Sequence, residues 1–240
     1  MFNYSFSTRI LFFLRDLRSQ RLYEILNTHC SGNVLDIGGA SFYVTAKRKG
    51  VRADSWTCVE SSESTRPDIS DSKFKFIIAD GCALPFPDAC FDTVINIQVL
   101  EHTFEPFKMF QEAVRVLKPT GKAIFFIPQT GTIHLAPHHY QNFTRFWIEE
   151  AARRTNLRIV ALENFGGWWS SIASRGFYFF LSAFRRPGNF ITGSKRSWRF
   201  YVLLPLMAFT AIFSIPVALF LALGDFEEEA PNYLLVAQRD

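Results

Sequence analysis

A short segment early in the chain combines an acidic residue with glycines, as ligand-binding loops do. Asp36, Gly38 and Gly39 lie within "VLDIGGASFY", residues 34–43. Glycines after a strand let the backbone approach a ligand and leave N–H groups available at the start of the next helix. The spacing departs from G-x-G-x-x-G, the fingerprint of dinucleotide sites. A carboxylate before the glycines attracts cations and repels a pyrophosphate, so the loop favours a ligand that carries an amine or a sulfonium.

Polar residues also end three later apolar segments. Glu60 ends "SWTCVE", 24 residues after Asp36, a spacing that suits an acid accepting both hydroxyls of a ribose. Asp80 ends "KFKFIIAD", where it is placed to accept from an adenine amino group, and Gln98 ends "FDTVINIQ". If these segments are parallel strands, their ends meet at one edge of the sheet, and the four residues form one candidate ligand site.

Histidines form a second group of chemically active residues, because imidazole is suited to move protons at neutral pH. His102 follows the fourth apolar segment, and His138 and His139 lie in "IHLAPHHYQNFTRF" after the fifth. We expect them to supply a catalytic base or an acceptor contact; the alternative is that they pack or cap the loops. We expect no metal site, because Pro137 breaks the helix that would align His134 with His138.

The elements that must position these residues are apolar strands alternating with amphipathic helices. This alternation predicts an α/β fold with a doubly wound, mostly parallel seven-stranded sheet. Right-handed crossovers place the carboxyl ends of the strands at one edge, where ligands bind. The expected strands are "NVLDIG", "SWTCVE", "KFKFIIAD", "FDTVINIQ", "KAIFFIP", "LRIVALEN" and "NYLLVAQR".

The chain divides into three parts by composition. Residues 1–29 form a leading amphipathic helix, with apolar residues at helical spacing and charges between them. Residues 30–166 and 231–240 form the α/β domain. Residues 167–230 form a hydrophobic helical insertion before the last strand.

The insertion contains 25 consecutive uncharged residues, which is the length of a membrane span. Pro205 and Pro216 interrupt this run, and a single crossing would separate the last strand from its sheet. We therefore expect an in-plane helix pair or a shallow re-entrant hairpin bent at the prolines. The alternatives are a helical cap over the sheet and a dimer interface. The residues expected at lipid head groups and at the interface are Arg175, Arg185, Arg186, Lys195, Arg196, Arg199, Trp168, Trp169 and Trp198.

The charge distribution also favours a membrane. Residues 145–199 hold ten Lys and Arg against three Asp and Glu, a net of +7, which leaves −3 for the rest of a chain of net charge +4. A basic block beside apolar sequence favours an anionic membrane surface over nucleic acid. The start of the chain has too short an apolar run for a secretory signal. We expect a cytoplasmic protein, peripherally or monotopically associated with a membrane; the oligomeric state stays open.

Several segments together resemble one enzyme family. "VLDIGGA", "WTCVE", "ADGCALPFPDACFDTV", "VLEH" and "RVLKPTG" resemble the class I S-adenosylmethionine-dependent methyltransferases, in their small-molecule and lipid-modifying branch. The resemblance covers about residues 30–166 and 231–239, and it implies a Rossmann-like sheet. The usual first motif of the family is D-x-G-x-G-x-G; this chain keeps Gly38 in register and has Ala40 and Phe42 at the other two glycine positions.

The resemblance implies S-adenosylmethionine as cofactor. Asp36 and Gly38 would frame its methionine end, Glu60 its ribose and Asp80 its adenine, while Gln98 would lie beside the sulfur. The full implied set is Asp36, Gly38, Gly39, Glu60, Asp80, Gly81 and Gln98.

The expected activity is methyl transfer, in which positioning of the acceptor contributes much of the rate. In the family, the loop after the fifth strand commonly borders the acceptor pocket. We expect O-methylation of a lipid-linked or apolar acceptor at a membrane surface. The alternatives are C-methylation of a quinone or lipid precursor and a non-catalytic membrane-bound scaffold.

Overall fold

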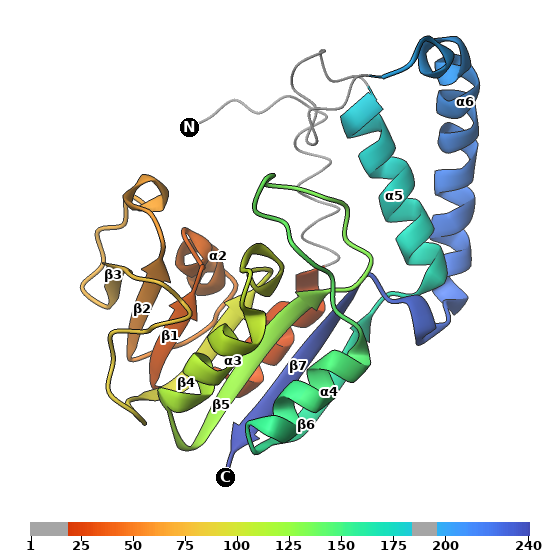
Figure 1. The fold of residues 1–240 in the computed structure, drawn as a ribbon. Coiled ribbons are helices and arrows are strands. Elements are labelled where there is room, and N and C mark those ends of the chain that lie inside the picture. Colours follow the sequence, from red (N-terminus) through yellow and green to blue (C-terminus); the bar gives the residue numbers. More distant parts are fainter. Residues whose placement is uncertain (1–18, 184–195) are drawn as a thin grey trace.

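The computed structural model describes residues 19–183 and 196–240 (Figure 1). Residues 19–29 are helical, in agreement with the expected leading helix, whose first 18 residues lie outside the described part. Arg185, Arg186 and Lys195, expected at lipid head groups, also lie outside it.

A seven-stranded sheet forms the centre of the fold, with the strand order β3-β2-β1-β4-β5-β7-β6. The first five strands pair in parallel, whereas β7 pairs antiparallel with both β5 and β6. The prediction of a mostly parallel seven-stranded sheet is therefore confirmed. The strands are β1 (Asn33–Ile37), β2 (Ser55–Glu60), β3 (Phe74–Ile78), β4 (Phe91–Ile97), β5 (Leu117–Pro128), β6 (Leu157–Phe165) and β7 (Asn232–Arg239).

The expectation that every strand ends at the ligand edge was wrong for β7. Asn232 pairs with Pro128, the last residue of β5, so β7 begins at that edge. A buried strand can run in either direction with the same apolar sequence, because its burial is the same in both.

Helices cover both faces of the sheet. One face packs against α3 (Pro106–Arg115) and α4 (Arg145–Arg154), where the rings of Phe110 and Phe125 stack 4.5 Å apart. The other face packs against residues 19–29 and α2 (Phe42–Arg48), around the buried Trp56. The helices of both layers do not cover the edge where the parallel strands end, and loops form this edge.

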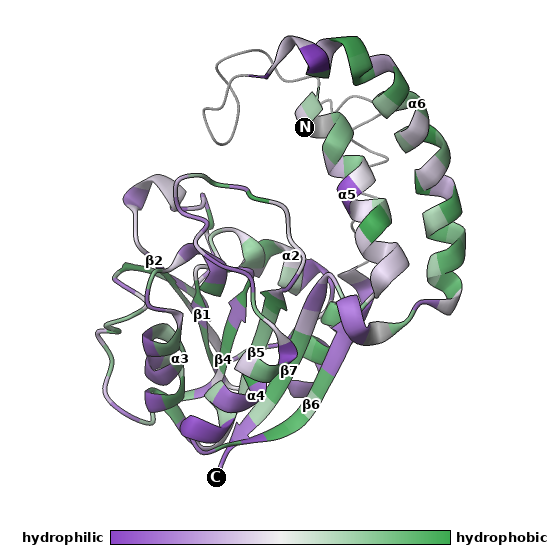
Figure 2. Cartoon of the chain, turned by 45° about the vertical axis from the view of Figure 1, so that its right-hand side comes forward, coloured by the Kyte–Doolittle hydropathy of each residue, from purple (hydrophilic) through white to green (hydrophobic). Residues whose placement is uncertain are grey.

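The insertion forms a helical hairpin that projects from the sheet (Figure 1; Figure 2). Its helices are α5 (Trp168–Ala183) and α6 (Trp198–Leu221). They approach closely through small residues: Ala173, Ala211 and Ala218 are buried, and a Cβ added to Gly176 would lie 2.8 Å from Ile215 Cγ1. Small contact residues are typical of helices that pair in lipid.

The prolines do not interrupt α6, contrary to the sequence prediction. Pro205 and Pro216 both lie inside one 24-residue helix. A proline removes only one backbone hydrogen bond, and α6 is supported by its packing against α5.

Helix α6 is mostly apolar, as the hydropathy colouring shows (Figure 2), and among the described residues much of its surface is exposed. Within the described part, the segment Trp198–Gly224 is the one helix long and apolar enough to cross a membrane, judged by length and composition alone. The side chains of Val202, Leu206, Phe209, Phe213 and Phe220 are all more than half exposed. The hairpin therefore does not act as a cap over the sheet.

Asp225 closes the base of the hairpin. Its Oδ2 accepts from the N–H groups of Gly167 (2.8 Å) and Ser170 (2.9 Å), and its Oδ1 accepts from that of Trp169 (2.8 Å). Burial raises the pKa of this carboxyl, but hydrogen bonds, chiefly from Ser170, outweigh burial and lower the pKa below its usual value. The carboxylate also lies at the positive end of the α5 dipole.

We predict that Asp225→Ala will open the hairpin base, because it leaves three N–H groups without this acceptor. The loss of a helix cap costs about 1–2 kcal/mol. Hydrogen exchange of the amides in the first turn of α5 should accelerate by about tenfold, while Glu228→Ala, at an exposed neighbouring position, should not change it. Unchanged exchange in Asp225→Ala would mean that packing alone holds the base.

Candidate active site

The loop after β1 has a shape that requires its glycines. Gly38 has a φ of +76° and donates its N–H to Val59 O at 2.8 Å. A Cβ added to Gly39 would lie 1.8 Å from Asp36 Oδ2. Ala40 also has a positive φ, +42°, at a cost of about 1 kcal/mol. The ring of Phe42, the first residue of α2, stacks on Tyr23, 6.1 Å away, and packs against the core on that face of the sheet.

Asp36 lies fully buried beneath this loop. Its Oδ2 accepts from Trp56 Nε1 at 3.2 Å, while its Oδ1 has no hydrogen-bond partner among the described residues. Burial raises the pKa of Asp36 to about 8; the Trp56 hydrogen bond opposes this shift, and the nearby charge of Glu60 adds to it. A cationic ligand group at the loop would favour the ionised carboxylate.

Glu60 joins the end of β2 to the same loop. Its Oε1 accepts from Ala40 N–H at 2.8 Å, and burial raises the pKa of its carboxyl. Asp80 follows β3 and is exposed; its Oδ1 accepts from Cys82 N–H at 2.8 Å. Gly81 is buried and closely packed, since an added Cβ would lie 2.7 Å from Met109 Cε and would require that side chain to shift. The acids and glycines expected to bind a cofactor thus lie along one edge of three neighbouring strands.

Gln98 follows β4 with a φ of +58°, and its Nε2 donates to Asn232 Oδ1 at 2.7 Å. The sequence analysis missed Asn232, because it placed the end of β7, and not its start, at this edge. The antiparallel direction of β7 was the missing information.

Three histidines meet beside this edge. His102 Nε2 lies 3.0 Å from His134 Nε2, and His139 brings a third ring nitrogen, so that the three potential ligand atoms lie within 4.8 Å of one another. His138 points elsewhere: its Nδ1 lies 3.1 Å from the Tyr140 hydroxyl. The sequence analysis considered a helix pairing His134 with His138, whereas an irregular loop pairs His134 with His139.

Glu101 lies next to this cluster and was also missed. It is fully buried, neither carboxylate oxygen has a hydrogen-bond partner among the described residues, and burial raises the pKa of its carboxyl to about 7. Its Oε1 is 3.7 Å from His102 Nε2 and 3.8 Å from His134 Nε2. Its place between Leu100 and His102 in "VLEH" gave no sign that it would be buried.

The loop between β5 and α4, which carries His134 and His139, is hydrogen-bonded to the base of the hairpin. Thr130 Oγ1 lies 3.0 Å from Ser171 Oγ on α5, and Gln129 donates its N–H to Pro231 O at 2.9 Å. The loop, in green, rises above the end of β5 and extends toward α5 (Figure 1). The glycine loop, the histidine cluster and the hairpin therefore share one edge of the sheet.

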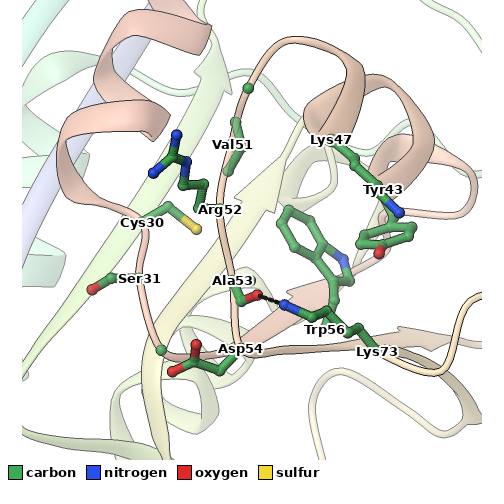
Figure 3. Close-up of a pocket in the computed structure, with 12 residues that line it drawn as sticks. Cys30, Ser31, Tyr43, Lys47, Val51, Arg52, Ala53, Asp54, Trp56 and Lys73 are labelled. Atoms are coloured by element: carbon green, nitrogen blue, oxygen red, sulfur yellow. Dashed lines mark hydrogen bonds between the residues drawn. The ribbon is translucent and has the colours of Figure 1, made fainter.

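A cavity of about 630 Å³ lies at the opposite edge (Figure 3). Cys30 and Asp54, which line it, directly precede the region where β1 and β2 begin. Lys73 Nζ donates to Ala53 O across this region at 3.1 Å. The cavity is thus separate from the site at the strand ends.

Comparisons with known proteins agree with this fold. Residues 35–125 match a family described as a methyltransferase domain. A probable S-adenosylmethionine-dependent methyltransferase of Mycolicibacterium smegmatis is 29% identical over 150 residues, 58% of this chain and 55% of that protein. A sterol 4-C-methyltransferase of Caenorhabditis elegans is 27% identical over 176 residues, 65% of this chain and 52% of that protein.

A solved S-adenosylmethionine-dependent methyltransferase of Mesorhizobium loti shares the fold, with a TM-score of 0.56, 15% identity, and coverage of 92% of this chain and 98% of that one. The chain spans about half the length of the curated relatives it matches. It carries a methyltransferase domain of the class I, S-adenosylmethionine-dependent family.

We predict that Gly39→Ala will weaken S-adenosylmethionine binding by about tenfold or more, equivalent to at least about 1.4 kcal/mol. The added Cβ would displace either Asp36 or the loop. Gly224→Ala is the matched control, because an added Cβ there meets nothing within 4 Å. Calorimetric titration of the detergent-purified protein measures both affinities; equal affinities would show that the cofactor binds elsewhere.

Proposed function

We propose that the protein transfers a methyl group from S-adenosylmethionine to an oxygen of a lipid-linked or apolar acceptor at a membrane surface. The observation that carries this proposal is the shared edge: the glycine loop, the histidine cluster and the apolar hairpin all leave the sheet at the carboxyl ends of its parallel strands. An acceptor that enters along the hairpin would pass the histidines before it reaches the glycine loop.

The cofactor roles follow from the strand ends. Glu60 holds the ribose hydroxyls through the oxygen that Ala40 does not use. Asp80 and Gly81 border the adenine. Asp36 and the glycine loop hold the cationic methionine end, where the unpartnered Oδ1 of Asp36 favours positive charge. Gln98, fixed by Asn232, lies on the side of the sulfur.

The acceptor lies against the histidine cluster in this proposal. When bound, S-adenosylmethionine supplies a methyl group whose bond to sulfur breaks as the bond to the acceptor oxygen forms. His102 and His139 face the acceptor hydroxyl and accept its hydrogen. Holding the oxygen in line with the methyl group is the larger contribution of the chain.

The hairpin seats the domain on the membrane, with the sheet in the cytoplasm. Its uncovered apolar side chains bury in the interfacial region, and Arg175, Arg199 and Trp198 suit the head groups. This is a monotopic arrangement, because both ends of the hairpin return to the sheet at the same edge.

A second candidate is carbon methylation of a lipid. The similarity to a sterol 4-C-methyltransferase favours it, since that relative acts on an apolar ring system at carbon. Oxygen is preferred here because the cluster offers nitrogen lone pairs to a hydroxyl.

The proposal is tested with methyl-tritiated S-adenosylmethionine, the detergent-purified chain and a total lipid extract. We expect label in the organic phase, and an oxygen-bound methyl group in the NMR spectrum of the product. Glu60→Gln should lower kcat/KM by about 100-fold, because a charged hydrogen-bond acceptor is lost. Glu63→Gln, on the exposed turn that follows, is the control. A carbon-bound methyl group would favour the second candidate, and an absence of labelled lipid would favour the scaffold.

Membrane seating is tested by flotation with phosphatidylcholine–phosphatidylserine vesicles. Phe209→Asp with Phe213→Asp should lower the partition coefficient by about 100-fold or more, because each buried Phe contributes about 1.5–3 kcal/mol. Phe146→Asp removes an even more exposed ring from α4 and should leave flotation unchanged. Equal loss in both variants would argue against the hairpin as the seat.

A further inference from the structure

His102, His134 and His139 bring three ring nitrogens together beside the buried carboxylate of Glu101. We propose that these three imidazoles and the carboxylate of Glu101 bind a divalent transition-metal ion on the acceptor side of the site. The hydrogen bonds around the rings determine where each lone pair lies.

The first two rings turn their lone pairs toward each other. His102 Nδ1 lies 2.6 Å from the carbonyl oxygen of His138, and His134 Nδ1 lies 3.0 Å from that of Thr132. A carbonyl oxygen can only accept, so each Nδ1 carries the hydrogen, and in the neutral ring each Nε2 has a lone pair. The two Nε2 atoms are 3.0 Å apart. Two lone pairs at this distance repel each other unless a cation lies between them.

The third ring is fixed in the same way. Asn142 Nδ2 donates to Gly131 O at 3.2 Å, which assigns the opposite atom of the amide as oxygen. That oxygen lies 3.3 Å from His139 Nε2, so this nitrogen donates and Nδ1 carries the lone pair. This lone pair accepts a long hydrogen bond, 3.4 Å, from the His134 N–H, which a bound metal ion would replace. All three imidazoles thus donate one N–H to an acceptor of the protein. Histidines that ligate metals in proteins are held by such hydrogen bonds from their other ring nitrogen.

Glu101 supplies a fourth ligand and a negative charge. Both of its oxygens are buried and lack hydrogen-bond partners among the described residues. Its Oε1 is 3.7 Å and 3.8 Å from the two Nε2 atoms, too far for a hydrogen bond. A buried carboxylate without a donor is costly, and a bound cation would satisfy it.

The spacing fits a first-row transition metal. Ligands about 2.0–2.1 Å from a tetrahedral Zn²⁺ lie about 3.3–3.4 Å from one another. The distances of 3.0 Å, 3.7 Å and 3.8 Å among the first two histidines and Glu101 bracket this value. Three imidazoles and one carboxylate are ligands for Zn²⁺, Fe²⁺, Co²⁺ or Ni²⁺, and not for Mg²⁺ or Ca²⁺.

This site deepens the proposed function and, in its catalytic part, rests on it. The acceptor oxygen would bind the cation instead of an imidazole, and its proton would leave to solvent before the oxygen takes the methyl group. A cation lowers the pKa of a bound hydroxyl and holds the oxygen in one place. The ion is neither oxidised nor reduced.

Metal binding is measured on the full chain in detergent after treatment with a chelator. Zn²⁺ is titrated by calorimetry, and Co²⁺ by its visible absorption. We expect one ion per chain and d–d bands of a site with nitrogen and oxygen ligands. His134→Asn with His139→Asn, and separately Glu101→Gln, should weaken Zn²⁺ binding by about 100-fold or more. His138→Asn is the matched control, because that side chain belongs to the same loop but faces Tyr140.

Binding of S-adenosylmethionine reports whether each variant is folded, independently of the metal. If the wild-type chain binds no Zn²⁺, or if the wild type and the double variant bind Zn²⁺ with equal affinity, the metal site is overturned even if labelled lipid forms. Normal metal binding without labelled lipid leaves the metal site intact and overturns the proposed function. If both hold, label transfer should fall after chelation and return with added Zn²⁺ or Co²⁺; transfer that is insensitive to chelation overturns the catalytic role.

Discussion

The position of β7 controls the rest of the architecture. Because β7 runs antiparallel between β5 and β6, its first residue pairs with Pro128 and with Phe165, the last residues of its two neighbours. The chain must therefore leave the sheet after β6 and return to it at the same edge. This constraint makes the insertion a hairpin, brings Asn232 against Gln98, and lets Asp225 cap α5 from the returning segment. An apolar projection at the ligand edge is a consequence of sheet topology.

The same edge concentrates buried polar atoms that have no hydrogen-bond partner among the described residues. Asp36 Oδ1 lies beneath the glycine loop, and both oxygens of Glu101 lie beneath the histidine cluster. Each unsatisfied buried acceptor costs about 1–3 kcal/mol, and more if it is charged. The apolar core on either face of the sheet supplies the stability that tolerates them. Two unpartnered carboxylates near the ends of adjacent strands indicate two places for positive charge, one beneath the glycine loop and one beside the histidine cluster.

How far the sequence predicts this site depends on how local each feature is. The strands, the acid–glycine loop and Glu60 follow from patterns within a few residues, and the structure has them where they were expected. Asn232 and Glu101 could not be found that way, since one depends on strand direction and the other on burial by distant residues. The histidine cluster depends on an irregular loop between β5 and α4, for which no periodicity exists to read. The sequence analysis overestimated how far Pro205 and Pro216 interrupt α6, because it did not include the contact between α6 and α5.

Fold alone does not specify which atom is methylated, so the case for oxygen depends on the cluster and the hairpin together. Methylation at carbon would require a pocket of the right shape and a base. Imidazole lone pairs, or a metal ion that they hold, would instead contact a hydroxyl group of the acceptor. The hairpin adds a second restriction, because its exposed side chains, such as Phe209 and Phe213, remain costly in water until lipid or an apolar partner covers them. Seating them in a bilayer turns the ligand edge toward the membrane surface, since α5 and α6 are attached at that edge. The acceptor would then be held by its apolar part in the membrane and by its oxygen at the histidines, and the chain would need few further contacts to place it.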